Sequence, residues 1–299
     1  MAVNGLSVLG VPSSAGAHHA GQDGAPRALR TGGLLQQLRS RVADLRDEGD
    51  LPTEVFKVDP AHPTHRNLPA VVGVARAAAD ATERILRSGR TVLVLGGDCT
   101  ITLGVVAGAQ RVHRDVGLAY FDGDADLTTP VTTRSGILDS MGVAHLLGIA
   151  DTDLARLDRP APMLADDHLV MLGYDPNDPD SFDKAALAAH PGVLHFPDHE
   201  LREAPEAVAR HALETLTSRT SHLIVHFDVD AVTSSDLPLG NFPHYGTGIP
   251  LDNATTVLKI LCAAPQLAAI VLTEVNPSYD PSGRQLDRYI DAITQAIAS

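Results

Sequence analysis

The sequence is poor in cysteine, in basic residues and in long apolar runs, and each shortage argues against a class of protein. Its two cysteines, Cys99 and Cys262, lie far apart and have no CxxC spacing. We therefore expect no disulfide framework and a reducing compartment such as the cytoplasm. Lys and Arg number 23 against 37 Asp and Glu, for a formal net charge of -14. Because nucleic-acid phosphates require a basic face, this balance argues against a nucleic-acid partner.

Membrane and nucleotide motifs are also missing. No apolar run approaches the length of a membrane span, so we expect no membrane partner. The first residues, MAVNGLSVLG, lack the basic start and long apolar segment of a signal peptide. GGDCTITLG at 96–104 has no GxGxxG pattern, and the chain has no P-loop lysine motif, which argues against a nucleotide-binding protein. The acidity itself fits a cationic substrate, bound metal ions or mere solubility.

Short runs rich in Val, Ile and Leu alternate with segments of helical periodicity. This alternation predicts an α/β fold with a parallel sheet, whose strands are apolar because both faces are covered. The predicted strands lie near 6–11, 54–58, 91–95, 116–121, 168–173, 192–196, 222–228 and 268–274. The predicted helices lie near 69–88, 101–112, 184–190, 204–218, 253–263 and 283–298. No linker or internal repeat interrupts the pattern, so one domain over 1–299 is the simplest interpretation.

Carboxylates directly follow two of the apolar runs. VGLAYF leads into Asp122, Asp124 and Asp126, and HLIVHF leads into Asp228 and Asp230. A spacing of two places such side chains on one face of an extended chain, where they repel one another unless cations neutralise them or water solvates them. A single Asp in this position commonly closes a turn or caps a helix. Two such sets beyond the carboxyl ends of parallel strands instead favour an oxygen-rich site for divalent metal.

Two more strands end in groups that can act chemically. TVLVL leads into Gly96-Gly97-Asp98-Cys99, and AAIVLT leads into Glu274. A lone cysteine is often only a small buried apolar residue, but the glycine pair permits the close backbone approach that a crowded site requires. The loops 124–140 and 231–250, which follow two of these strands, are long enough to suggest a functional role.

These residues together resemble a known family. GGDCT (96–100), FDGDAD (121–126), HFDVDAV (226–232) and TEVNP (273–277) resemble, in order and spacing, the signature of the arginase/agmatinase ureohydrolases. The stretch 21–30 is similar to the glycine- and proline-containing opening loop of that family. The resemblance implies a three-layer α/β/α fold with a mostly parallel eight-stranded sheet. It also implies a dinuclear manganese centre and hydrolysis of a small cationic guanidino substrate to urea by metal-bound hydroxide. Relatives are commonly homo-oligomers, trimers or hexamers.

The resemblance also assigns roles by position. It implies a set of six metal ligands: Cys99, Asp122, Asp124, Asp126, Asp228 and Asp230. It implies that Glu274 faces the guanidinium group and that Asp126 and Asp139 handle protons. Candidates for contacting the rest of the substrate are Thr128, Ser135 and Asp178, although the acidic stretch 175–180 is equally typical of a solvated turn.

Two departures from the family pattern fall among the implied ligands, because Cys99 and Asp124 replace the two usual histidines. The usual set, two neutral histidines and four aspartates, carries -4. Five aspartates (-5) and one thiolate (-1) would carry -6. Such a shell makes a metal-bound water less acidic, which predicts slower turnover at neutral pH or a higher pH optimum. A thiolate favours zinc or iron over manganese. A single metal, or an unligated Cys99, is a further alternative.

The third motif also departs from the family. His226 stands where the family has serine, and the second acidic-proline element is displaced to Asp236-Leu-Pro238. The departures leave other functions open: an amidine or formimino hydrolase on the same scaffold, a relative of metal-dependent deacetylases, or a pseudoenzyme that has lost turnover.

Overall fold

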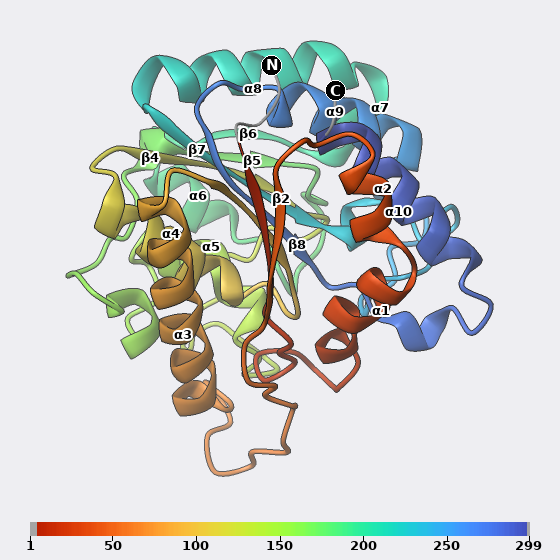
Figure 1. Cartoon of the computed structure of the whole chain (residues 1–299). Coiled ribbons are helices and arrows are strands. Elements are labelled where there is room, and N and C mark those ends of the chain that lie inside the picture. The colour runs from red at the N-terminus through yellow and green to blue at the C-terminus, as the bar shows by residue number, and fades with distance from the viewer. Residues whose placement is uncertain (1–4, 298–299) are drawn as a thin grey trace.

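Eight parallel strands form one sheet in a computed structural model that describes residues 5–297. The strand order is β2-β1-β3-β8-β7-β4-β5-β6 (Figure 1). The strands are β1 (Leu6–Gly10), β2 (Leu45–Asp50), β3 (Thr91–Leu95), β4 (Val116–Phe121), β5 (Leu169–Leu172), β6 (Leu194–Phe196), β7 (His222–Asp228) and β8 (Leu267–Thr273). This is the predicted α/β class with a parallel eight-stranded sheet. The first four residues, and residue 298 of the last predicted helix, lie outside the described range.

Helices cover both faces of the sheet, which gives three layers (Figure 1). The helices are α1 (Ala25–Thr31), α2 (Leu34–Arg39), α3 (Leu68–Arg87), α4 (Ile101–Val112), α5 (Gly142–Leu146), α6 (Lys184–Ala189), α7 (Asp198–Glu203), α8 (Pro205–Arg219), α9 (Leu251–Cys262) and α10 (Arg284–Ile297). All six predicted helices are present within two residues of the predicted bounds. None of the helices in the described part of the chain is both long enough and apolar enough to cross a bilayer.

Alternate residues of each central strand enter two separate apolar cores. In β3, Leu93 and Leu95 pack into one core with α1, α2, α8, α9 and α10. Val92 and Val94 pack into the other core with α3, α4 and α5. This follows from the two-residue period of a strand and explains why TVLVL is apolar at nearly every position. The central strands β3, β8, β7 and β4 are therefore fixed on both faces, and the segments that follow them start from a rigid base.

The predicted strand at 54–58 is wrong. The strand that pairs with β1 is Leu45–Asp50, and Glu54 forms only an isolated bridge with Ser13. β2 lies at the sheet edge, where four of its six residues are charged and much of the strand is exposed. Its stability comes from the backbone ladder to β1 rather than from apolar side chains, so it lacks the apolar pattern that predicts buried strands.

The packing of α3 on α4 depends on a glycine. A Cβ atom added at Gly104 would lie 2.3 Å from the backbone oxygen of Ala75 in α3. The two helix backbones can approach this closely only because position 104 has no side chain. α4 begins directly after Cys99 and Thr100, so this contact also fixes the start of the helix next to the acidic strand ends.

Gly104→Ala is expected to destabilise the protein by about 1–3 kcal/mol, because the added methyl group overpacks a contact with backbone that cannot move aside. The matched control is Gly73→Ala in the exposed face of α3, where an added Cβ meets nothing within 4 Å. That change should stabilise by roughly 0.5–1 kcal/mol, since alanine is the better helix former. Chemical denaturation of both variants measures the two effects, and shifts of the same sign would contradict this account.

Candidate metal centre and active site

The carboxyl ends of four adjacent strands meet at one edge of the sheet. β4 and β7 pair Phe121 with Phe227. The next residues, Asp122 and Asp228, therefore lie side by side at the carboxyl ends of the two strands. β7 and β8 pair Asp228 with Thr273, which places Glu274 next to this pair. The order β3-β8-β7-β4 therefore brings residues from distant parts of the sequence to one place, as expected for a parallel α/β sheet.

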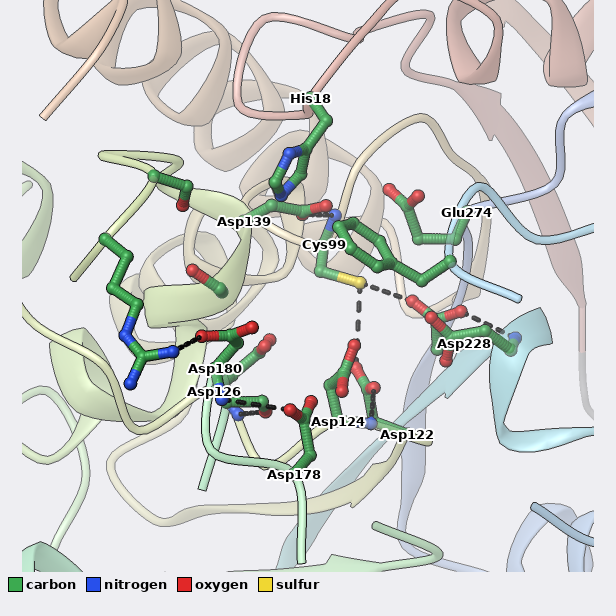
Figure 2. A pocket seen from close by; sticks show the side chains of 16 residues that line it. His18, Cys99, Asp122, Asp124, Asp126, Asp139, Asp178, Asp180, Asp228 and Glu274 are labelled. Atoms are coloured by element: carbon green, nitrogen blue, oxygen red, sulfur yellow. Dashed lines mark hydrogen bonds and ion pairs between the residues drawn. The ribbon is translucent and has the colours of Figure 1, made fainter. Parts of the chain in front are cut away.

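A cavity of about 240 Å³ opens between these strand ends. Figure 2 shows carboxylates around its wall, with the Cys99 sulfur and the His18 ring also facing it. His18 comes from the N-terminal loop, which Asp98 attaches to β3 by accepting hydrogen bonds from Ser13 Oγ at 3.0 Å and the Gly16 backbone at 3.1 Å. The lining residues with carboxyl groups are Asp122, Asp124, Asp126, Asp139, Asp178, Asp180, Asp228, Asp230 and Glu274.

Cys99 lies at the centre of the metal-binding candidates. Its Sγ is 2.6 Å from Asp228 Oδ2 and 3.7 Å from Asp122 Oδ2 (Figure 2). Burial, followed by the charges of these two carboxylates, raises the pKa of the thiol well above its usual value. In the absence of a cation the group is therefore a thiol that donates to carboxylate, and it becomes a ligand thiolate only if a metal ion offsets the surrounding charge.

Asp122 and Asp228 are oriented by their own loops. The Oδ1 atom of each accepts a hydrogen bond from the backbone two residues later, at 2.7 Å from Asp124 and 2.8 Å from Asp230. Both Oδ2 atoms face Cys99, and they also contact His226 Nε2 at 3.2 Å (Asp122) and the Thr273 hydroxyl at 3.3 Å (Asp228). Burial, and then the neighbouring carboxylates, raise the pKa of Asp122 and of Asp228 well above the usual range. Such shifts show that the negative charges lack compensation within the protein.

Several buried polar atoms of this site have no protein partner, among them Asp124 Oδ1 and Glu274 Oε1. A buried acceptor without a donor is costly, and a bound cation removes that cost. The charge excess fits a divalent metal, and the unpartnered oxygens fit a bound cation, either a metal ion or the cationic group of a ligand. Three sets of ligand atoms lie within 4.8 Å of one another: Cys99, Asp122, His226 and Asp228; Cys99, Asp139 and Glu274; and Asp124, Asp230 and His244.

Glu274 is held in a strained and specific position. Its backbone φ of 61° is in the left-handed region, which residues other than glycine rarely adopt. Gln22 Nε2 donates to Glu274 Oε2 at 2.8 Å, and this bond leaves Oε1 free. Burial, followed by the nearby Asp139 charge, raises the pKa of Glu274 well above its usual value. Backbone strain of this kind is concentrated at functional sites.

Asp139 and Asp126 occupy different parts of the same cavity. Asp139 Oδ1 accepts a hydrogen bond from the Cys99 backbone at 2.7 Å, and its carboxyl group faces Glu274. Asp126 has a φ of 50° and accepts a hydrogen bond from the Tyr120 hydroxyl at 2.5 Å. Asp126 lies outside all three ligand sets, although it lines the cavity.

The three substrate-contact candidates are placed differently. Ser135 and Asp178 line the cavity. Thr128 is absent from the lining, and its hydroxyl donates to the Ser140 carbonyl at 2.7 Å. Arg134 is the one arginine among the lining residues, and it pairs with Asp180 at 3.1 Å near the cavity mouth. The wall as a whole therefore suits a cationic ligand.

Three further side chains belong to this site although the motifs did not assign them: Gln22, His226 and His244. His226 precedes Asp228 by two residues, and the strand period therefore puts both on one face, a relation visible in the sequence. Burial lowers the pKa of His226 to about 3, so its ring is neutral. His244 comes from the loop after β7. Burial acts to lower its pKa, but Asp124 and Asp230 raise it to about 9.

Comparisons with known proteins point to one family. The model of the arginase family matches residues 4–298. The chain belongs to the arginase family. An arginase of Neurospora crassa is 31% identical over 287 residues, with 91% of this chain and 78% of that protein covered. An arginase of Bacillus caldovelox is 28% identical over 280 residues, with 92% of both covered.

Solved structures of the arginase family share the fold. The arginase of Bacillus cereus is 25% identical, covers 99% of both chains and has a TM-score of 0.84. Formimidoylglutamase of Bacillus subtilis is 19% identical and has a TM-score of 0.76, with 99% of this chain and 87% of that chain covered. Membership makes the protein an arginase-family hydrolase.

The displaced acidic-proline element of the third family motif does not reach the site. Asp236 Oδ2 accepts a hydrogen bond from the Leu251 backbone at the start of α9, and Oδ1 pairs with Arg288 at 2.6 Å. Asp236 therefore connects the loop after β7 to two helices, and this arginase-family chain holds its longer loop by a structural ion pair.

Proposed function

We propose that the protein hydrolyses a C–N bond of a small guanidino compound, arginine- or agmatine-like, and releases urea and an amine. One observation carries the proposal: buried Glu274, whose Oε1 has no hydrogen-bond partner, lines an acidic cavity of an arginase-family chain. A guanidinium ion offers planar N–H donors and a positive charge, which are what this oxygen lacks.

The residues that would hold divalent metal are the six implied ligands, with Mn²⁺ as the first choice because oxygen ligands predominate. Zn²⁺ or Fe²⁺, or a single ion, is the alternative if Cys99 binds as a thiolate. When bound, divalent ions activate water and balance the carboxylate charge.

The chain's own groups would orient the substrate and move protons. Glu274, positioned by Gln22, would accept hydrogen bonds from the guanidinium nitrogens. Asp126 would accept a proton from the attacking water and pass it to the leaving amine, while Tyr120 keeps its carboxyl group in place. Asp139 lies close enough to Glu274 to share this role, and burial, followed by the Asp98 charge, raises its pKa towards the range required of a general acid. The rest of the substrate would contact Ser135 and Asp178, and also Ser140, which Thr128 holds in place.

The test is a product assay on the Mn²⁺-loaded protein with a panel of guanidino and formimino compounds. Urea release from a guanidino compound is the expected result. Release of formamide or ammonia without urea would contradict this proposal and support hydrolysis of an amidine or formimino compound instead. Bound metal with no turnover of any compound would overturn it in favour of a pseudoenzyme, an outcome that the Cys99 and Asp124 replacements make worth testing.

We further propose that 1–299 form one catalytic domain that assembles as a homotrimer or homohexamer in the cytoplasm. The family match over nearly the whole chain supports the first part. The two buried cysteines, both free thiols, support a reducing compartment.

A further inference from the structure

Two histidines contact the carboxylates of the acidic site, and one of them, His226, stands where the family pattern has serine. His226 is at the end of β7 and His244 is in the loop after it. Each lies beside two carboxylates, and the two groups use different carboxylates. The first group is His226 with Asp122, Asp228 and Cys99, and the second is His244 with Asp124 and Asp230.

The two distances from His226 to its neighbours in the first group are close to those between ligands of one ion, whereas the 2.6 Å between Cys99 Sγ and Asp228 Oδ2 is a hydrogen bond. His226 Nε2 is 3.2 Å from Asp122 Oδ2 and 3.8 Å from Cys99 Sγ. Two atoms that both bind a tetrahedral ion at about 2.0–2.3 Å lie roughly 3.3–3.8 Å apart. The other ring nitrogen, Nδ1, is 2.7 Å from Thr102 Oγ1. A hydrogen bond of this kind fixes the ring and its tautomer, as is usual for histidines that bind metal.

The second group also has one histidine and two carboxylates, but it has no thiol and is less deeply buried. His244 Nε2 lies 3.7 Å from Asp124 Oδ2 and 4.0 Å from Asp230 Oδ2. Neither His244 Nε2 nor Asp124 Oδ1 has a hydrogen-bond partner in the described protein. His244 Nε2 thus has only long ion pairs, and the ligand atoms of the three side chains lie within 4.8 Å of one another, which leaves room for a cation between them.

We propose that His226 and His244 are metal ligands, one in each of two metal positions, and replace the imidazoles that residues 99 and 124 do not supply. This inference rests on the proposed function insofar as that function requires divalent metal. In each group two carboxylates and one neutral imidazole match one divalent ion in charge, provided that Cys99 of the first group stays a neutral thiol. Asp126 lies outside both groups, so this inference removes it from the six ligands proposed above and leaves its carboxyl group for hydrogen bonding.

The competing explanation gives both histidines purely structural roles. The His226 ring stacks on Tyr120 with ring centroids 4.0 Å apart, and His244 is a cation beside two carboxylates. Under that explanation, loss of either ring would change stability but would not change the ligands of a bound ion.

Pulsed EPR of the Mn²⁺-loaded protein distinguishes the two, because coordinated imidazole nitrogen couples to the electron spin of the metal. We expect nitrogen coupling in the wild type, a weaker signal in His226→Gln and in His244→Gln, and no imidazole signal in the double variant. The Kd for Mn²⁺, measured by calorimetry, should rise by about 100-fold or more in each single variant, since loss of even an outer partner costs about 10- to 100-fold. Unchanged nitrogen coupling in both variants would overturn the inference.

Thr102→Val gives a second route that does not remove the buried ring. Valine keeps the shape of threonine but cannot hold Nδ1, so the Kd for Mn²⁺ should rise by about 10- to 100-fold. Matched controls are His145→Gln, another fully buried histidine, and His190→Gln, which pairs with Asp166 at 2.7 Å. Both should leave the Kd and the EPR signal unchanged. An equal loss of affinity in the controls would refute the assignment.

The outcomes separate this inference from the proposed function. Nitrogen coupling that depends on His226 and His244, without turnover of any guanidino compound, supports the ligands and rejects the activity. Urea release together with EPR spectra that both variants leave unchanged supports the activity and rejects the ligands. A wild-type protein that binds no Mn²⁺, Zn²⁺ or Fe²⁺ rejects both.

Discussion

Glu274→Gln is expected to lower kcat/KM for the guanidino substrate by roughly 30- to 5,000-fold, with metal content unchanged. Removing one partner of a buried charge pair costs about 2–5 kcal/mol, and this range converts to that loss of rate. Glutamine has nearly the same shape and can still accept from Gln22, but it replaces one acceptor oxygen by an N–H₂ group that opposes the guanidinium donors. The variant therefore removes charge recognition while the cavity keeps its size.

Steady-state kinetics and elemental analysis of the same preparation measure both parts of this expectation. Glu203→Gln, an exposed carboxylate on α7, is the matched control and should leave kcat/KM unchanged. A loss of bound metal in Glu274→Gln would contradict the assignment, because Glu274 would then be a ligand of the ion through the set that it forms with Cys99 and Asp139.

The buried strands of the sheet could be predicted because their own residues are largely apolar. TVLVL and VGLAYF are apolar at nearly every position, and HLIVHFD is apolar at four of seven, since both faces of these strands are covered. The edge strand β2 could not be predicted in the same way. LRDEGD owes its conformation to backbone pairing with β1, and its acids Asp47 and Glu48 accept hydrogen bonds from Arg30 and Arg84 of other elements. A single sequence does not show such partners.

The same distinction applies to the site. The convergence of Asp122, Asp228 and Glu274 follows from two local facts, a two-residue period and the position of strand ends in a parallel sheet. His226 lies two residues before Asp228, so the same period could have predicted its place in the site. The places of Gln22 and His244 could not be predicted, because each lies on a loop whose path over the sheet depends on tertiary packing. Gln22 contacts a residue 252 positions later in the sequence.

Removal of divalent metal is the second change expected to have a large effect, and here the effect is on stability. The metal-free site concentrates buried carboxylates, and burial together with their mutual charges raises their pKa values. A ligand that binds only the folded state stabilises it by about 4 kcal/mol at 1,000 times its Kd. For a chain of this size that corresponds to a rise in Tm of roughly 8 °C. Thermal unfolding after chelation and after reloading with Mn²⁺ measures it.

Asp228→Asn should change Tm in opposite directions in the metal-free and the Mn²⁺-loaded protein. The amide retains an Oδ1 that accepts from the Asp230 backbone, and its N–H₂ group can donate to Asp122, so one source of repulsion becomes an attraction. Without metal the variant should therefore melt above the wild type, and with Mn²⁺ below it, because a ligand is lost. Asp287→Asn, an exposed carboxylate on α10, should leave both melting temperatures unchanged. If chelation leaves the wild-type Tm unaltered, or if Asp228→Asn lowers the Tm equally in both conditions, then the buried charge is not what metal binding stabilises. The acidic strand ends would in that case be stable by themselves, through protonation or hydrogen bonding within the protein.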